Sequence, residues 1–206
     1  MNSLLKWTAR LGLPVLLCLA ATPGCQPKAF TAAERAVILE QDSLLQVMVL
    51  PKDSVVLRAV SRDLGPEELQ SAELKALIEK MLYTVQDPSQ DGVGIAAPQV
   101  GINRRLVCVQ RFDLPGEPFQ AYPNIRLDSL GGEMVAGPEG CLSVPGLRGL
   151  VPRHSEIQIS YEDLSTGKRR SETVRGFTAV IFQHEYDHLD GILYIDKADS
   201  VWVDMR

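Results

Sequence analysis

Two histidines and a glutamate within five residues form the strongest candidate for chemistry in this 206-residue sequence. They are His184, Glu185 and His188, in the stretch "QHEYDHLD". On a helix, two histidines four residues apart project from one face, and the glutamate beside the first can reach a metal-bound water. The flanking residues are strongly apolar, so we expect both imidazoles to point inward, where ligation of a metal would satisfy them.

A catalytic metal site of this type usually has three protein ligands and one open position. Only 18 residues follow His188, and they contain neither histidine nor glutamate. The third ligand must therefore lie upstream or be an aspartate of the C-terminal tail. If the ligand lies upstream, we expect the last residues, "DKADSVWVDMR", not to reach the site. The aspartates available in the tail are Asp190, Asp196, Asp199 and Asp204.

The best upstream ligand is Cys141, in "GPEGCLSVPG". Thiolate is a good ligand for Zn²⁺ or Fe²⁺, and a Cys/His/His set leaves a fourth position for water. Because bound metal lowers the pKa of that water, Glu185 could accept its proton, which describes a hydrolase for a carbonyl substrate. Asp187 could accept a hydrogen bond from a ligand histidine or could be a surface charge; the sequence leaves both open.

Hydrolysis of a carbonyl also needs donors where negative charge develops. The stretch "DGVGIAAPQVG" supplies a candidate, because Gly92 and Gly94 let backbone approach a ligand and Gln99 carries an amide N–H. The alternative for this stretch is a tight turn before a strand, with Gln99 in solvent.

Three motifs in order, "GVGIAAPQ" (92–99), "EGCLS" (139–143) and "QHEYDH" (183–188), resemble the signature motifs of the peptide deformylases. The resemblance covers roughly residues 45–200. It implies removal of the formyl group from N-formylmethionyl peptides, with release of formate. It also implies one metal ion, commonly Fe²⁺, which Zn²⁺, Ni²⁺ or Co²⁺ can replace. The implied fold is α+β, with small antiparallel sheets wrapped around a central helix that bears HExxH.

The resemblance also implies a role for each matching residue. Cys141, His184 and His188 would be metal ligands, and Glu185 the general base and acid. Gln99 and the backbone N–H of Leu142 would hold the formyl oxygen. His184 would also help to line the pocket for the methionine side chain, and Glu139 would brace the site. The residues implied in substrate binding are Val93, Gly94, Ile95, Glu139, Gly140, Arg148, Phe177 and Ile181.

The elements that must position these residues can be read from capping and periodicity. Thr31 and Glu34 form a capping-box pattern that predicts a helix to about Met48. A longer helix is predicted from Pro66 to "QDPSQDG", and strands are predicted within 93–135. A short strand is expected in "LPKDSVVLRAV", a hairpin about 165–168 and a last helix from Gly176. "LDGILYI" is expected to leave that helix as a strand.

The N-terminus, "MNSLLKWTARLGLPVLLCLAATPGC", is typical of an export signal. Its positive residues precede an apolar run that ends in a lipobox-like sequence at Cys25, the lipidation candidate. We therefore expect residues 1–24 to be a leader, 25–44 a linker with a short helix, and 45–206 the catalytic domain. This predicts a membrane-associated, periplasm-facing lipoprotein; the alternative is a cytoplasmic enzyme, because deformylation belongs at the ribosome exit.

The net charge and the cysteine spacing argue against a nucleic-acid-binding protein and against a disulfide-rich protein. The net charge of −5 with no basic patch argues against a direct nucleic-acid partner. The resemblance implies an N-formylmethionyl peptide or nascent chain as the partner. The four cysteines contain no CxxC and predict no disulfide framework, and Cys108 is expected to be a buried hydrophobe. Two alternatives to a deformylase stay open: a metallohydrolase using a tail aspartate, and a non-catalytic metal-binding lipoprotein. No pattern indicates an oligomeric state.

Overall fold

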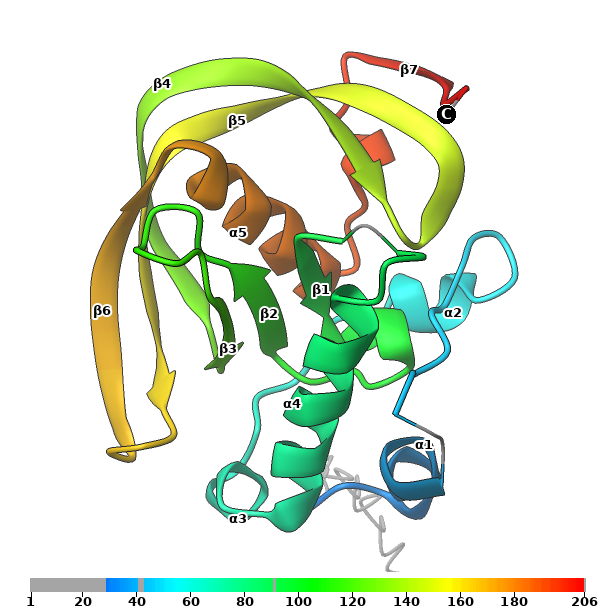
Figure 1. Ribbon diagram of the computed structural model, residues 1–206, viewed down its shortest axis with the longest axis vertical. Helices are drawn as coiled ribbons and strands as arrows, with labels where there is room; N and C mark the ends of the chain where they lie inside the picture. The colour runs from blue at the N-terminus through cyan, green and yellow to red at the C-terminus, as the bar shows by residue number, and fades with distance from the viewer. Residues whose placement is uncertain (1–28, 41–42, 91, 206) are drawn as a thin grey trace, which may run out of the picture.

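The computed structural model describes residues 29–40, 43–90 and 92–205 and has an α+β fold (Figure 1). The leader predicted for residues 1–24 and the lipidation candidate Cys25 lie outside these ranges. The helices and 3₁₀ helices are α1 (Ala32–Glu40), α2 (Ser54–Leu57), α3 (Pro66–Leu69), α4 (Ala72–Val85), η1 (Ala97–Val100), α5 (Gly176–Leu189) and η2 (Tyr194–Asp196). The strands are β1 (Gly94–Ala96), β2 (Leu106–Gln110), β3 (Phe119–Pro123), β4 (Arg126–Cys141), β5 (Val144–Asp163), β6 (Lys168–Arg175) and β7 (Ser200–Val203).

The strands form two antiparallel sheets. The smaller sheet has the order β1-β2-β3, and the larger has the order β4-β5-β6, with β7 paired to β5. The predicted hairpin is confirmed as β5 and β6, whose register pairs Asp163 with Lys168 beside the turn. β4 and β5 form a long hairpin, and its register brings Cys141 at the end of β4 opposite Val144. The third candidate ligand thus sits at the end of a strand.

Helix α5, which carries the HExxH motif, is the centre of the fold. It contacts β1 and β2 of the small sheet and β4, β5 and β6 of the large sheet, which enclose it in Figure 1. Ile181, Phe182 and Leu189 pack with Ile157 and Ile159 of β5 in one apolar cluster. Burial of this kind stabilises by roughly 25 cal/mol per Å² of apolar surface. The predicted α+β arrangement, with antiparallel sheets around the motif helix, is confirmed.

A second apolar cluster joins the N-terminal helix to the rest of the chain. Leu74, Leu77 and Met81 lie three to four residues apart on α4, so they form one buried face of that helix. Phe30, just before α1, and Ile38, within α1, pack into the same cluster. The segment predicted to be a linker with a short helix therefore contributes to the core.

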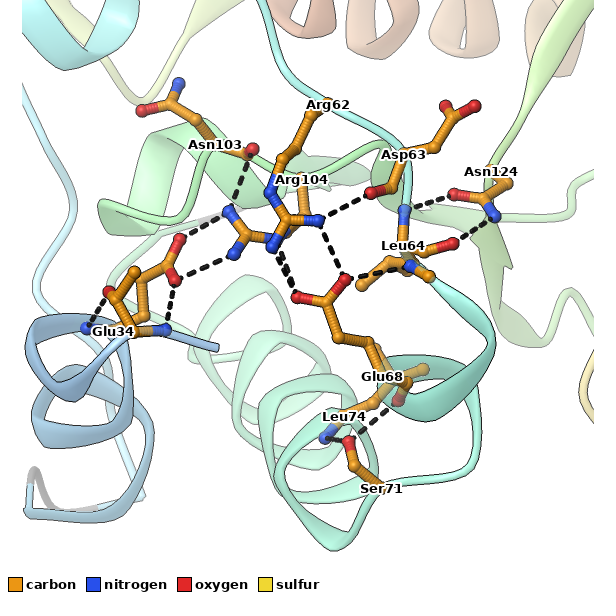
Figure 2. Close-up of polar contacts among 12 residues, drawn as sticks. Glu34, Arg62, Asp63, Leu64, Glu68, Ser71, Leu74, Asn103, Arg104 and Asn124 are labelled. Carbon is orange, nitrogen blue, oxygen red and sulfur yellow. Dashed lines mark hydrogen bonds and ion pairs between the residues drawn. The ribbon is translucent and has the colours of Figure 1, made fainter. Parts of the chain in front are cut away.

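Figure 2 shows the polar contacts that hold α1 in place. The Arg104 guanidinium, almost fully buried, donates to both oxygens of Glu34 and, through Nε, to Glu68 at 3.0 Å. Arg62 donates to both oxygens of Glu68 at 2.7 and 2.8 Å. Glu34 also accepts from the N–H of Thr31, so the predicted capping box is confirmed. Glu34 therefore both caps α1 and forms, with Arg104, an ion pair that we call the clamp.

Four local predictions differ from the structure. Helix α1 ends at Glu40, well before Met48. The segment "LPKDSVVLRAV" contains the short helix α2 and no strand. The helix predicted from Pro66 is two helices, because the Ser71 hydroxyl accepts from Leu74 N–H and donates to the Glu68 carbonyl, which starts a new helix. "LDGILYI" contains the 3₁₀ helix η2 in place of a strand. Within the described ranges, no helix is long and apolar enough to cross a membrane.

Candidate active site

Three candidate ligands converge in the structure. The Cys141 sulfur and one ring nitrogen of each of His184 and His188 lie within 4.8 Å of one another. The Cys141 sulfur is 3.2 Å from His188 Nε2, and the two imidazole centroids are 5.2 Å apart. The helix spacing places the histidines, and the β4–β5 hairpin brings the cysteine to them. A soft thiolate with two imidazoles is a donor set that suits Zn²⁺ or Fe²⁺.

A buried charge network supports this cluster. Glu139 accepts from His184 Nδ1 at 2.8 Å, which leaves His184 Nε2 directed at the cluster. The other contacts of Glu139 are to Arg153, whose Nε and Nη2 donate at 2.7 and 3.0 Å. Burial alone would raise the pKa of Glu139, but the contacts with His184 and Arg153 lower it to about 2. Glu139 is therefore a carboxylate that orients a ligand, which fits the bracing role better than contact with substrate.

Asp187 takes neither of the two roles left open by the sequence. It is buried and accepts from Arg153 Nη1 and from Lys197 Nζ, both at 2.6 Å. Nδ1 of His188 is buried and has no hydrogen-bond partner in the structure. Asp187 therefore neutralises the buried Arg153 guanidinium, together with Glu139, and is not an acceptor for a ligand histidine.

Glu185 faces the cavity from the same helix. Its side chain is buried, and burial raises its pKa to about 7, with opposing effects from His184 and Glu139. Its Oε2 has no hydrogen-bond partner. Its Oε1 lies 2.6 Å from the position that a Cβ on Gly94 would take, so any side chain there would displace the carboxylate. A carboxylate with a pKa near 7 can act as a general base and acid at neutral pH.

Gln99 is held with its amide nitrogen toward the cluster. Its Oε1 accepts from the Ala96 N–H at 2.8 Å, so Nε2 must point the other way. Nε2 lies 3.6 Å from the Cys141 sulfur and 3.3 Å from the Ser143 hydroxyl oxygen. Gln99 is almost fully buried, which contradicts the alternative of a solvated side chain. The N–H can therefore serve as a fixed donor beside the candidate metal site.

A cavity of about 350 Å³ opens over these groups. Ile95 does not line it; its side chain is fully buried in the core, because neighbouring residues of a strand point to opposite faces. A substrate contact of Ile95 could therefore come only from its main chain on the edge strand β1, and its predicted role in substrate binding stays a prediction. His188 lies buried below the cavity wall. The predicted residues that do line the cavity are Val93, Gly94, Gln99, Glu139, Gly140, Cys141, Leu142, Arg148, Phe177, Ile181, His184 and Glu185.

Sequence reasoning gave no role to Arg153 or Ser143 and considered Asp204 only as a possible metal ligand. Arg153 shares the inward face of β5 with Val151 and Ile157, and this alternation was a usable signal for a buried charge that needs carboxylates. Ser143 lies within the "EGCLS" motif and donates its N–H to the Cys141 sulfur at 3.4 Å. Asp204 lines the cavity, which corrects the expectation that the tail does not reach the site. No local signal placed Asp204 in the cavity lining.

Comparison with known proteins identifies the family. Residues 44–202 match the family model described as polypeptide deformylase. The chain belongs to the peptide deformylase family. "Peptide deformylase 2" of Nostoc sp. is 43% identical over 140 residues, which cover 65% of this chain and 76% of that protein. "Peptide deformylase" of Leptospira biflexa is 36% identical over 159 residues, which cover 74% and 87% of the two chains.

Solved deformylase structures share the fold. A class I type b peptide deformylase from Acinetobacter baumannii, with Met-Ala-Ser bound, has a TM-score of 0.67 and 35% identity, covering 75% of this chain and 98% of that one. The deformylase of Thermotoga maritima has the same TM-score at 32% identity, covering 76% and 99%. The match to the deformylase family begins at residue 44, after α1.

Proposed function

We propose that this chain is a metal-dependent hydrolase that removes the formyl group from N-formylmethionyl peptides and releases formate. The single observation that carries the proposal is the convergence, in one cavity, of the ligand cluster with Glu185 and Gln99. The family membership supports the same reaction. So do the inhibitor actinonin and the peptide Met-Ala-Ser, which are bound to the Acinetobacter relative.

Cys141, His184 and His188 would hold the metal, which we propose to be Fe²⁺, with Zn²⁺, Ni²⁺ or Co²⁺ as replacements. The donor set fits such an ion, because thiolate and imidazole suit it and Glu139 leaves His184 Nε2 available. A metal held there would supply Lewis-acid activation of water and of a carbonyl oxygen.

In this mechanism Glu185 transfers the protons, and Gln99 and Leu142 stabilise the negative charge on the formyl oxygen. Glu185 takes a proton from the attacking water, whose oxygen adds to the formyl carbon. As negative charge develops on the formyl oxygen, Gln99 Nε2–H and the Leu142 N–H donate to it. The carbon–nitrogen bond then breaks, and Glu185 returns its proton to the departing amine. The products are formate and a peptide with a free N-terminal methionine.

The cavity wall favours an N-terminal methionine. Val93, Phe177 and Ile181 provide apolar surface beside the catalytic groups. Gly94 belongs to the edge strand β1 of the small sheet, where a peptide can add alongside. The absence of a side chain at Gly94 leaves the Glu185 carboxylate in place. Gly140 and Arg148 would contact the residues after methionine. A nascent chain or released peptide is therefore the proposed substrate, and no nucleic-acid partner is proposed.

The test is formate release from a formyl-Met-Ala-Ser peptide. Residues 26–206, which keep α1, would be loaded anaerobically with Fe²⁺ and compared with Glu185→Gln at equal metal content. We expect release by the parent and a loss of at least about 100-fold in the variant, as for removal of a general base. Equal release by both, or none by a metal-loaded parent, contradicts the proposal.

A metallohydrolase that uses a tail aspartate is the other reading of the motif. Of the aspartates in the tail, Asp190, Asp196 and Asp204 are paired with Arg105, Arg58 and Arg148. None of these joins the ligand group found among the described residues. Cys141→Ala separates the two readings, because it should abolish metal binding in a deformylase and preserve it if an aspartate is the third ligand.

For the location, we propose that residues 1–24 are a leader and that lipidated Cys25 ties the protein to a membrane, facing the periplasm. The apolar run and lipobox-like sequence support this. Residues 25–44 would follow as a linker whose helix packs on the catalytic domain, 45–206. Fractionation of cells that express the full chain or Cys25→Ser tests it. Membrane recovery of the parent alone is expected; recovery of both in the cytoplasm overturns it.

A further inference from the structure

The C-terminal strand builds one wall of the substrate cavity. β7 pairs with β5, and the register sets Leu147 opposite Val203 and Arg148 opposite Trp202. The N–H of Asp204, one residue after the strand, donates to the Gly146 carbonyl at 2.9 Å. This pairing carries the Asp204 side chain into the cavity lining, beside Leu147 and Arg148. The tail is therefore fixed at the cavity by main-chain hydrogen bonds.

Asp204 forms an ion pair with Arg148, a cationic side chain of this cavity wall. Arg148 Nε donates to Asp204 Oδ2 at 3.1 Å, and the side chains keep 27% and 21% of their exposure. The Arg148 guanidinium lies over Gly140, with its central carbon 3.8 Å from the position of a Cβ there. Gly140 directly precedes the candidate ligand Cys141. The ion pair thus lies in the cavity lining beside Gly140 and the candidate ligand Cys141.

We propose that Asp204 is a specificity-determining residue: it neutralises Arg148 and so disfavours substrates with a negative charge on the residues that follow the methionine. This rests on the proposed function of the same cavity. A carboxylate in the substrate could bind the Arg148 guanidinium only by displacing Asp204, because both would use the same donor. An uncharged peptide leaves the pair intact.

The test compares two peptides that differ in one charge, formyl-Met-Ala-Ser with a free carboxylate and its C-terminal amide. The quantity measured is the ratio of kcat/KM for the carboxylate to kcat/KM for the amide. Asp204→Asn keeps the shape and the main-chain hydrogen bond but removes the charge, so Arg148 becomes available. We expect the ratio to rise about fivefold, as for one partly exposed ion pair, and the gain to shrink at 1 M salt.

Two further variants make the result decisive. Asp199→Asn removes an exposed charge of the same tail outside the cavity lining, and should leave the ratio unchanged. Adding Arg148→Ala to Asp204→Asn should abolish the gain. Equal changes for both peptides in Asp204→Asn, or a gain that persists without Arg148, would overturn the proposal.

Binding of the formyl-free products separates this proposal from the proposed function. Calorimetric affinities of Met-Ala-Ser and its amide for the metal-loaded protein give the same ratio without any catalysis. If no formate is released but Asp204→Asn raises the relative affinity for the carboxylate about fivefold, the reaction is wrong and the specificity proposal stands. If formate is released but Asp204→Asn changes neither the kcat/KM ratio nor the affinity ratio, the proposed reaction stands and the specificity proposal is wrong.

Discussion

Gly94→Ala offers a test of the catalytic geometry that leaves the metal ligands untouched. The added Cβ would lie 2.6 Å from Glu185 Oε1 and 2.8 Å from Ile181 Cγ2. A carbon–oxygen contact needs about 3.3 Å, so the carboxylate must retreat by about 0.7 Å. A catalytic group has to be held within about 0.5 Å, and a misplacement of about 1 Å can cost about 100-fold. We therefore expect kcat to fall by about 30- to 100-fold, or about 2–2.7 kcal/mol in the activation barrier.

Formate release and metal content would be measured on the same preparations. Gly137→Ala is the matched control, because a Cβ there meets nothing within 4 Å. It should keep parental kcat, and both variants should keep parental metal content. Overpacking at Gly94 should also lower the free energy of unfolding by about 1–3 kcal/mol, measured with denaturant. Parental kcat in Gly94→Ala would refute the reasoning, since the Glu185 carboxylate would then not need its observed position.

Three other perturbations have defined outcomes. Glu139→Gln should weaken metal affinity by about 10- to 100-fold in a chelator competition, because the oriented acceptor of His184 loses its charge; unchanged affinity would contradict the bracing role. Arg104→Ala should lower the free energy of unfolding by about 3 kcal/mol in urea, the low end for a broken buried pair because Arg62 stays on Glu68. Burial would raise the pKa of Glu68, but its contacts with Arg62 and Arg104 lower it overall, so its stabilising effect is complete above about pH 4.5 and is lost as the pH falls further. The Tm should therefore drop less between pH 5 and pH 3 in Glu68→Gln than in the parent, and identical drops would count against this ion pair.

The parts of the site that depend on local spacing could be predicted from the sequence. His184, Glu185 and His188 share one helix, so a spacing of four residues was enough to place them together. Cys141 required the order of three motifs, because no local rule brings the end of β4 to α5. Gly94 and Ile95 were both predicted at the substrate. Alternation along β1 turns the Ile95 side chain into the core, and a contact of its main chain with substrate stays a prediction.

The rest depends on pairing between distant segments. Asp204 reaches the cavity through the register of β7 with β5, which pairs residues that lie 50 to 56 positions apart in the sequence. The "LDGILYI" stretch ends in a short apolar run, Ile192 to Ile195, which is suited to a strand. However, Leu193 and Tyr194 are both buried in a third cluster, with Val144 and Val151, and this packing favours the 3₁₀ helix η2. Tertiary packing of this kind overrides local propensity, and composition carries no trace of it.

The clamp between Glu34 and Arg104 has a consequence for how related chains can vary. Arg104 is a buried cation whose partner Glu34 comes from a helix outside the family match. A relative that lacks this helix leaves two guanidinium groups, Arg62 and Arg104, on the single carboxylate of Glu68. It should therefore lose the charge at position 104 or supply another carboxylate, because a buried charge without full compensation is costly. It must also cover the surface that Phe30 and Ile38 bury. Positions 34 and 104 should therefore change together during evolution, and an acid–arginine pair there would identify relatives with the same N-terminal helix.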